Sequence, residues 1–352
     1  MQIDMHLYGV YALARAAGLK DRIARDIAFA SQYVDDAVED GEVVVSDDYA
    51  LLHSMTSHKP IDVENAVKGD QWKVWLPFHF LPGNEPENGT FTERLVCRKN
   101  SKVAQQMITH ALDDKNSTFW PHLIGITAHV YADTFAHHGF VGICTTSNKV
   151  KPQTVKTHGI NIKNILETLA TKLEKFAGIF AQIVPVGHGA VATYPDIPFL
   201  NWEYKYEKKT ISKDTIHREN PADFMDGARE LHSFFGRFAE KSNEFADPDS
   251  KREWDDIKDH VKTIINTQQL KKSDRIEQWK QALRDGKFFN PTAVDRGISY
   301  NEYIWTLEQL KATNASRKQA KESNAVKFLR ASQYHRFYVL QHLLPQFELL
   351  VS

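Results

Sequence analysis

Three polar side chains constrain the fold of this chain more than any others: His129, Asp133 and His137. They recur at steps of four within residues 119–144, FWPHLIGITAHVYADTFAHHGFVGIC. Four residues advance an α-helix by about 400°, so these side chains lie within about 80° of one another on one helical face. Neutral imidazole and carboxylate are ligands of zinc and similar divalent ions. The spacing therefore predicts a helix that carries a metal site.

The residues around this motif are mostly apolar, among them Ile126, Val130 and Phe135. An ionised carboxylate buried on such a helix needs a compensating charge, and a bound cation is one source of it. The alternative is a helix whose histidines are each hydrogen-bonded inside the core. The spacing leaves open whether His137 or His138 is the third ligand.

Hydrophobic periodicity predicts a mainly α protein: a multi-helix metal-binding domain with long irregular loops and a C-terminal helical extension. The expected helices cover residues 7–40 (interrupted at Gly18), 103–112, 119 onward, 159–184, 223–245, 250–286 and 300 to the C-terminus. The intervening residues 41–100, apart from a short strand at VVVSDDY, and residues 185–221 are expected to be irregular. We expect a metal-site domain over residues 1–222 with helices 223–352 packed on it, or one single domain.

Further candidate ligands are scattered through the first 200 residues. Acidic side chains at the C-terminal end of a helix oppose the helix dipole, so Asp35 and Asp36 call for a cation nearby. A single tetrahedral site needs only three or four protein ligands, so a larger set suits two or three ions. The predicted metal ligands are Asp4, His6, Asp36, His53, His58, His79, His129, Asp133, His137, His188 and Asp196.

Composition excludes several classes of protein. The formal net charge of −1 gives no overall attraction to nucleic acid or to an anionic membrane. The two cysteines, Cys97 and Cys144, form no disulfide framework and fit a reducing compartment. The N-terminus lacks the basic region of a signal peptide, and no apolar run reaches 18 residues, so we expect a cytoplasmic protein with no stable membrane insertion.

Other catalytic templates are absent from the sequence. It contains no HExxH, no Glu-x-x-His pair of a di-iron bundle, no His-Asp dipeptide of the HD-type phosphohydrolases, no Walker A motif and no GxSxG. A scattered set of histidines and aspartates remains, and two-metal sites of that kind serve phosphoryl chemistry.

The His129-x3-Asp133 helix, with Asp35 or Asp36 and His53 or His58 before it, resembles the superfamily of zinc-dependent phospholipases C and fungal-type single-strand nucleases. That resemblance implies an all-α fold and a three-ion cluster that also uses the chain's own N-terminus, with Asp4 and His6 replacing or supplementing the terminal ligands. This sequence departs from the pattern. Only three or four residues separate Asp133 from the next histidines, and the family's last ligand pair has no clear match.

Four further segments, MQIDMHLYG, YVDDA, FHFLPGN and HVYADTFAHHGF, also look like a family of uncharacterised bacterial proteins. This likeness runs nearly the full length of the chain but implies no activity.

Together these features predict a metal-dependent hydrolase that binds two or three divalent ions, zinc first, with manganese or iron as alternatives. The expected substrate is a phosphodiester, a nucleic acid or nucleotide rather than a lipid, with Asp35 or Asp36 as the catalytic carboxylate that orients the attacking water. One alternative is a phospholipase C-like lipid hydrolase, for which the FHFLPG segment would supply an apolar rim. Another is a non-catalytic binding protein stabilised by its metal.

Overall fold

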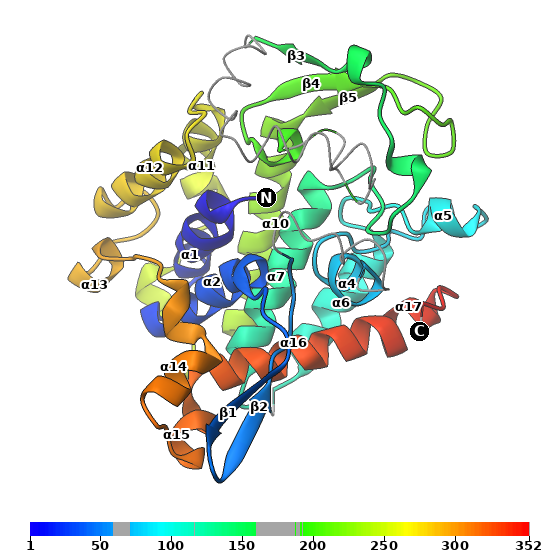
Figure 1. Cartoon of the computed structure of the whole chain (residues 1–352). Coiled ribbons are helices and arrows are strands. Elements are labelled where there is room, and N and C mark those ends of the chain that lie inside the picture. The colour runs from blue at the N-terminus through cyan, green and yellow to red at the C-terminus, as the bar shows by residue number, and fades with distance from the viewer. Residues whose placement is uncertain (59–70, 116, 160–186, 188–190, 192, 352) are drawn as a thin grey trace.

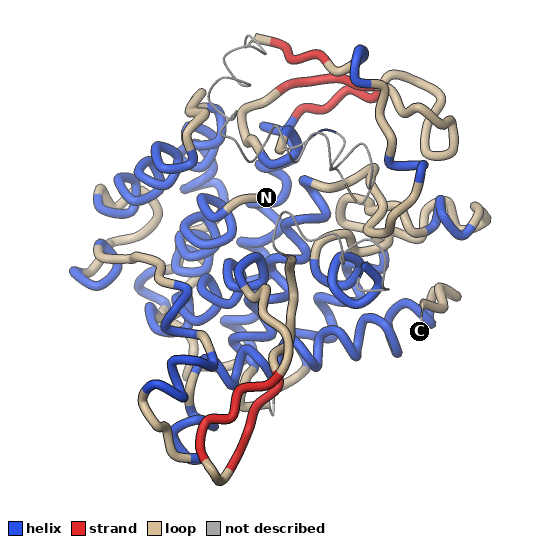
Figure 2. Tube along the Cα trace, viewed as in Figure 1, coloured by secondary structure: helices blue, strands red, loops and turns tan. Residues whose placement is uncertain are grey.

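The computed structural model describes residues 1–58, 71–115, 117–159, 187, 191 and 193–351. The protein is mainly α-helical, with two small antiparallel sheets at opposite ends of the molecule (Figures 1 and 2). Apart from Gly159, the predicted helix over residues 159–184 lies outside the described residues, and so does the predicted ligand His188.

The α-helices of the described residues are α1 Val10–Ala16, α2 Asp21–Asp36, α4 Leu76–Phe78, α5 Phe91–Arg94, α6 Lys102–Asp113, α7 Trp120–Ala136, α10 Asn220–Lys241, α11 Trp254–Asn266, α12 Lys272–Arg284, α13 Ala293–Arg296, α14 Leu307–Ala312, α15 Arg317–Glu322, α16 Asn324–Tyr338 and α17 Leu344–Gln346. Three π-helical segments are η1 Asp4–Gly9, η2 Gln71–Trp75 and η9 Val339–Leu343. Short 3-10 turns occur at Thr146–Asn148, Pro152–Thr154, Tyr194–Asp196, Pro248–Ser250 and Glu302–Trp305. The strands are β1 Glu42–Ser46, β2 Tyr49–Leu52, β3 Lys156–His158, β4 Asn201–Tyr204 and β5 Ile216–Glu219.

Helix α7 runs through the middle of the molecule and packs against α2, α6, α10 and α16 (Figure 1). All of its residues except Pro121 are buried, as expected of a helix that is apolar around its whole circumference. Gly125 allows the close approach of α2, because a Cβ atom there would lie only 2.4 Å from the Ile27 carbonyl oxygen. The helix that carries the predicted metal ligands is therefore the centre of the core.

The N-terminal segment is also buried. All six residues of η1 are enclosed, and the segment leads directly into α1. Arg275 of α12 holds it in place: its Nε donates to Asp4 Oδ2 at 2.8 Å, and one Nη donates to the Gln2 side chain at 2.5 Å. A helix near residue 275 thus fixes the position of the first residues of the chain.

The two sheets occupy the periphery. Strands β1 and β2 pair as an antiparallel hairpin, whose buried Val43 and Val45 pack with Leu307 of α14 and Leu329 of α16. The other sheet has the order β3-β4-β5 and, through residues such as Trp202, covers a small second core.

The main core draws side chains from both predicted domains. It includes Leu13 and Phe135 from residues 1–222, together with Phe234 and Leu343 from residues 223–352. The predicted helices over 103–112 and 223–245 correspond to α6 and α10, and the predicted strand at VVVSDDY corresponds to β1. No helix among the described residues is both long enough and apolar enough to cross a membrane.

A buried ion-pair network joins α1 to the C-terminal helices. Asp295 Oδ1 accepts hydrogen bonds from Arg15 Nε at 2.7 Å and from the Tyr11 hydroxyl at 2.6 Å, and Thr292 donates to its Oδ2. Burial alone would raise the pKa of Asp295, but the bonds from Arg15, Thr292 and Tyr11 hold it at about 2. The charged carboxylate is therefore the form that the fold stabilises.

We predict that Asp295→Asn lowers the free energy of unfolding by about 1.5–3 kcal/mol, because it removes one of the two carboxylates that pair with the buried Arg15 and leaves only Asp247. Urea unfolding followed by circular dichroism measures this. Glu277→Gln, which removes an exposed carboxylate beside Arg284, serves as the control, with an expected change within about 0.5 kcal/mol. The Asp295 pKa is lowered by folding, so the extra stability is present above about pH 4 and is lost as the pH falls toward 2. Equal stability of the two variants would contradict this prediction.

Candidate metal centre

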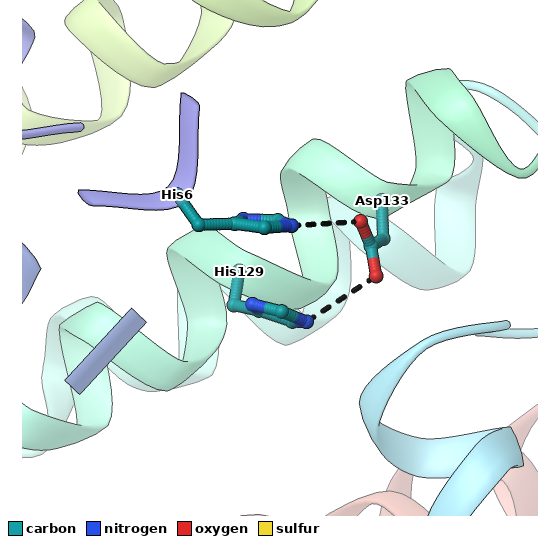
Figure 3. Close-up of side chains that lie close together, drawn as sticks. All are labelled: His6, His129 and Asp133. Atoms are coloured by element: carbon teal, nitrogen blue, oxygen red, sulfur yellow. Dashed lines mark ion pairs between the residues drawn. The ribbon is translucent and has the colours of Figure 1, made fainter. Parts of the chain in front are cut away.

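Asp133, near the C-terminal end of α7, lies at the centre of a cluster of imidazoles and is only 1% exposed. Its Oδ1 accepts a hydrogen bond from the Met1 ammonium at 2.6 Å and lies 3.2 Å from His6 Nε2. Figure 3 shows His6 and His129 on the two oxygens of this carboxylate. The two imidazole rings are stacked, with their centroids 3.9 Å apart. The N-terminal segment and α7 therefore meet at one buried carboxylate.

The other carboxylate oxygen faces two more imidazole nitrogens. Asp133 Oδ2 lies 3.3 Å from both His79 Nδ1 and His129 Nε2, and these two nitrogens are 3.2 Å apart. Bonds of 2.0–2.2 Å to a tetrahedral ion place its ligand atoms about 3.3–3.6 Å apart. The three atoms thus have nearly the spacing of ligands that share one ion.

The backbone fixes the orientation of each ring. His129 Nδ1 donates to the Ser31 carbonyl at 2.8 Å, His79 Nε2 to the Thr56 carbonyl at 2.9 Å, and His137 Nδ1 to the His79 carbonyl at 2.9 Å. A carbonyl oxygen can only accept, so each of these nitrogens carries the proton. In the neutral ring the other nitrogen is then a lone pair directed at the cluster, which is the arrangement that metal-binding histidines adopt.

Asp196 completes the side of the cluster nearest Met1. Its Oδ1 lies 3.1 Å from the Met1 amine and 3.1 Å from His137 Nε2. His137 is the C-cap of α7, directly after its last helical residue, Ala136. Its backbone amide still donates a hydrogen bond to the Asp133 carbonyl. The predicted spacing of four thus holds, although the third residue lies at the end of the helix.

Asp35 is the more exposed member of the cluster. Its Oδ1 lies 3.8 Å from His129 Nε2 and 3.9 Å from His79 Nδ1, and its side chain is 31% exposed. Two groups of potential ligand atoms therefore overlap among the described residues: His6, His129 and Asp133, and Asp35, His79 and His129. His129 belongs to both, but the single lone pair on its Nε2 can bind only one ion, so the group that could bridge two ions is the Asp133 carboxylate, with Oδ1 beside His6 and Oδ2 beside His79 and His129.

The electrostatics of the cluster favour the charged form of its central carboxylate. Burial would raise the pKa of Asp133, but His137, the Met1 ammonium and His129 hold it well below its usual value. Burial lowers the pKa of His6 to about 4, with further lowering by the charges of His129 and Met1. Burial also opposes the charge on the Met1 amine, yet Asp133 and Asp196 raise its pKa to about 11.

Several predicted ligands lie elsewhere. Asp4 pairs with Arg275, and Asp36 accepts from the Tyr300 hydroxyl at 2.5 Å and from the Gln32 amide at 2.9 Å. His53 lies 3.1 Å from Glu308, outside the cluster. His58 lies beside a neighbouring pocket, with its ring 5.8 Å from the ring of Trp75. Helix geometry explains the difference between the two adjacent acids, because successive side chains point about 100° apart.

The structure thus brings together His6, Asp35, His79, His129, Asp133, His137 and Asp196, with the Met1 amine. His138, the alternative to His137, instead lies 2.9 Å from Asp223. The backbone carbonyls of Ser31 and Thr56 orient the rings of His129 and His79. The sequence could not identify them as ring partners, because every residue has a backbone carbonyl.

One comparison with known proteins gave a match. A family described as "Family of unknown function (DUF6765)" matches residues 1–343. No curated protein and no solved structure matched the chain.

Proposed function

Because the chain belongs to the DUF6765 family, which has no known function, we propose an activity from the site alone: a metal-dependent phosphodiester hydrolase. The observation that carries the proposal is the orientation of the three rings of His79, His129 and His137. Each donates to a backbone carbonyl, and its other nitrogen faces a carboxylate: Asp133 for His79 and His129, and Asp196 for His137. Lone pairs directed at buried carboxylates favour a divalent ion between them.

The two overlapping ligand groups support a site for two or three ions, most simply zinc, with manganese or iron as alternatives. Such ions would supply a nucleophilic water at neutral pH and stabilise the charge on a phosphoryl group. This dinuclear arrangement, together with the resemblance of the His129-x3-Asp133 helix to the phospholipase C and nuclease superfamily, makes a phosphodiester the first substrate class to test.

Asp35 is the proposed catalytic carboxylate. It lies beside His79 and His129, is partly exposed, and lines a neighbouring pocket, so it can accept a proton from water and orient it toward a substrate. A closed structural site would have no such opening, and this opening favours catalysis over a purely structural metal. Asp36 accepts hydrogen bonds from two other side chains and faces away from the cluster.

The segment that the sequence offered as an apolar rim for the lipid alternative does not form one. Phe78, Phe80 and Leu81 of the FHFLPG segment are buried, so they form no exposed apolar rim for a membrane surface. The sequence-based expectation of such a rim was wrong, because these side chains contribute to the protein's own cores.

We predict that the purified protein, reconstituted if necessary, holds two or three zinc ions per chain, measured by elemental mass spectrometry. His129→Gln removes the ligand shared by both groups and should lose most of this metal. His122→Gln is the matched control, because His122 is equally buried on α7 but packs against Trp305. A protein that binds none of zinc, manganese or iron, or equal metal in both variants, would contradict the proposal.

We also predict that Asp35→Asn lowers kcat on bis(p-nitrophenyl) phosphate by about 10²–10⁴-fold, the usual contribution of a general base. Asp36→Asn should lower kcat by less than about tenfold, because its carboxylate lies outside the cluster. Steady-state kinetics with the metal-loaded proteins distinguish the two. Equal losses in both variants would remove Asp35 from the catalytic role.

A further inference from the structure

A cavity of about 560 Å³ lies beside the candidate metal centre. It is formed by the end of α2, the loop before residue 59, the segment around residue 305 and the N-terminal part of α16. Asp35 belongs to both places: it lines the cavity, and its Oδ1 faces His79 and His129. A molecule in this cavity would therefore lie next to the proposed ions.

The wall of this cavity is strongly acidic. Among the described residues, it contains five carboxylates and no lysine or arginine: Asp35, Asp36, Glu39, Glu302 and Glu308. The histidines in this wall are His53 and His58. Glu308 lies 3.1 Å from His53, and Asp35 faces the rings of the metal centre. The whole chain has a formal net charge of only −1, so this negative charge is a local feature.

Aromatic rings line the same cavity. Tyr33, Trp305 and Phe328 are buried and pack on one another, with the Tyr33 ring centre 4.8 Å from that of Phe328 and 5.9 Å from that of Trp305. The pKa of the Tyr33 hydroxyl is raised by burial and then by the negative charges of Glu308 and Asp36. The aromatic wall thus lies in a negative potential, which favours cations near the ring faces.

The spacing of the acids and the aromatic wall indicate what kind of ligand the cavity fits. Among the described residues, no group of three close ligand atoms is drawn from Asp36, Glu39, Glu302 and Glu308, so no three of these acids are placed to share one metal ion. Dispersed carboxylates beside aromatic rings suit an organic molecule with a positive charge.

We propose that this cavity binds an organic ammonium group of the substrate and thereby places the bond to be cleaved beside Asp35 and the metal centre. This inference rests on the proposed hydrolase function and specifies its substrate class: a small phosphodiester that carries an amine or quaternary ammonium group. It disfavours nucleic acid, because the acidic wall repels a polyanion.

The first experiment measures binding to the full-length, zinc-loaded protein by isothermal titration calorimetry. The probes are n-butylammonium and tetramethylammonium chloride, which distinguish a primary amine from a quaternary one, and neutral 1-pentanol. We expect one of the two cations to bind at least tenfold more tightly than pentanol, with affinity falling as salt is raised. Equal binding of pentanol, or no binding of either cation, would overturn the inference.

The matched variant is Glu302→Gln/Glu308→Gln, which neutralises two partly or fully exposed cavity residues without changing their size. It should weaken ammonium binding at least tenfold, while Glu240→Gln, on an exposed part of α10, should leave it unchanged. Circular dichroism and the urea midpoint check that both variants are folded. Unchanged binding in the folded double variant would place the cation elsewhere and overturn the inference.

A kinetic measurement separates this inference from the proposed function. The substrates are bis(p-nitrophenyl) phosphate and an aryl phosphodiester with a 2-(trimethylammonio)ethyl or 2-aminoethyl arm. The double variant should lower kcat/KM at least tenfold for the cationic substrates only. Turnover without this preference would overturn the cation site and leave the hydrolase intact. Ammonium binding without any turnover would support the cation site and count against the hydrolase.

Discussion

The carboxylate of Asp133 imposes the central electrostatic constraint on this structure. It is charged and almost completely buried in the middle of the core, where an isolated ion would be very unfavourable. The Met1 ammonium compensates this charge at Oδ1, where His6 also lies, and the rings of His79 and His129 lie beside Oδ2. These groups come from the N-terminus, from residue 79 and from α7 itself, so the position of this carboxylate depends on most of the tertiary structure.

The same constraint explains how distant parts of the chain cooperate. Arg275 of α12 pairs with Asp4 and holds the segment that carries Met1 and His6. The Ser31 carbonyl of α2 accepts a hydrogen bond from His129 Nδ1. Gly125 of α7, which has no side chain, lets α2 come close enough for this hydrogen bond. Helix α12, which carries none of the candidate ligands, and the backbone of α2 therefore help to determine the geometry of the cluster.

The adjacent acids Asp35 and Asp36 at the end of α2 lie in different environments, because consecutive helical side chains point about 100° apart. Asp35 faces the histidines and also lines the acidic cavity, whereas Asp36 is held by Tyr300 and Gln32. The proposed ions and the proposed ammonium group would thus share Asp35 as the residue between them. The acidic, aromatic cavity beside the histidine cluster is the reason for proposing small ammonium-bearing substrates and not polyanions.

The sequence by itself determined the parts of this protein that depend on local periodicity. The apolar run around His129 and Asp133 predicted the central helix, and helical spacing predicted α6, α10 and the mainly α fold. It identified His137 with that helix, and it named His6, His79 and Asp196 as further candidates beside Asp4, His53 and His58. Only the tertiary structure separated the two sets, because the position of a side chain relative to distant segments depends on packing and not on its neighbours in the chain. The pairing of Asp4 with Arg275 joins residues 271 positions apart, and no local pattern encodes such a contact.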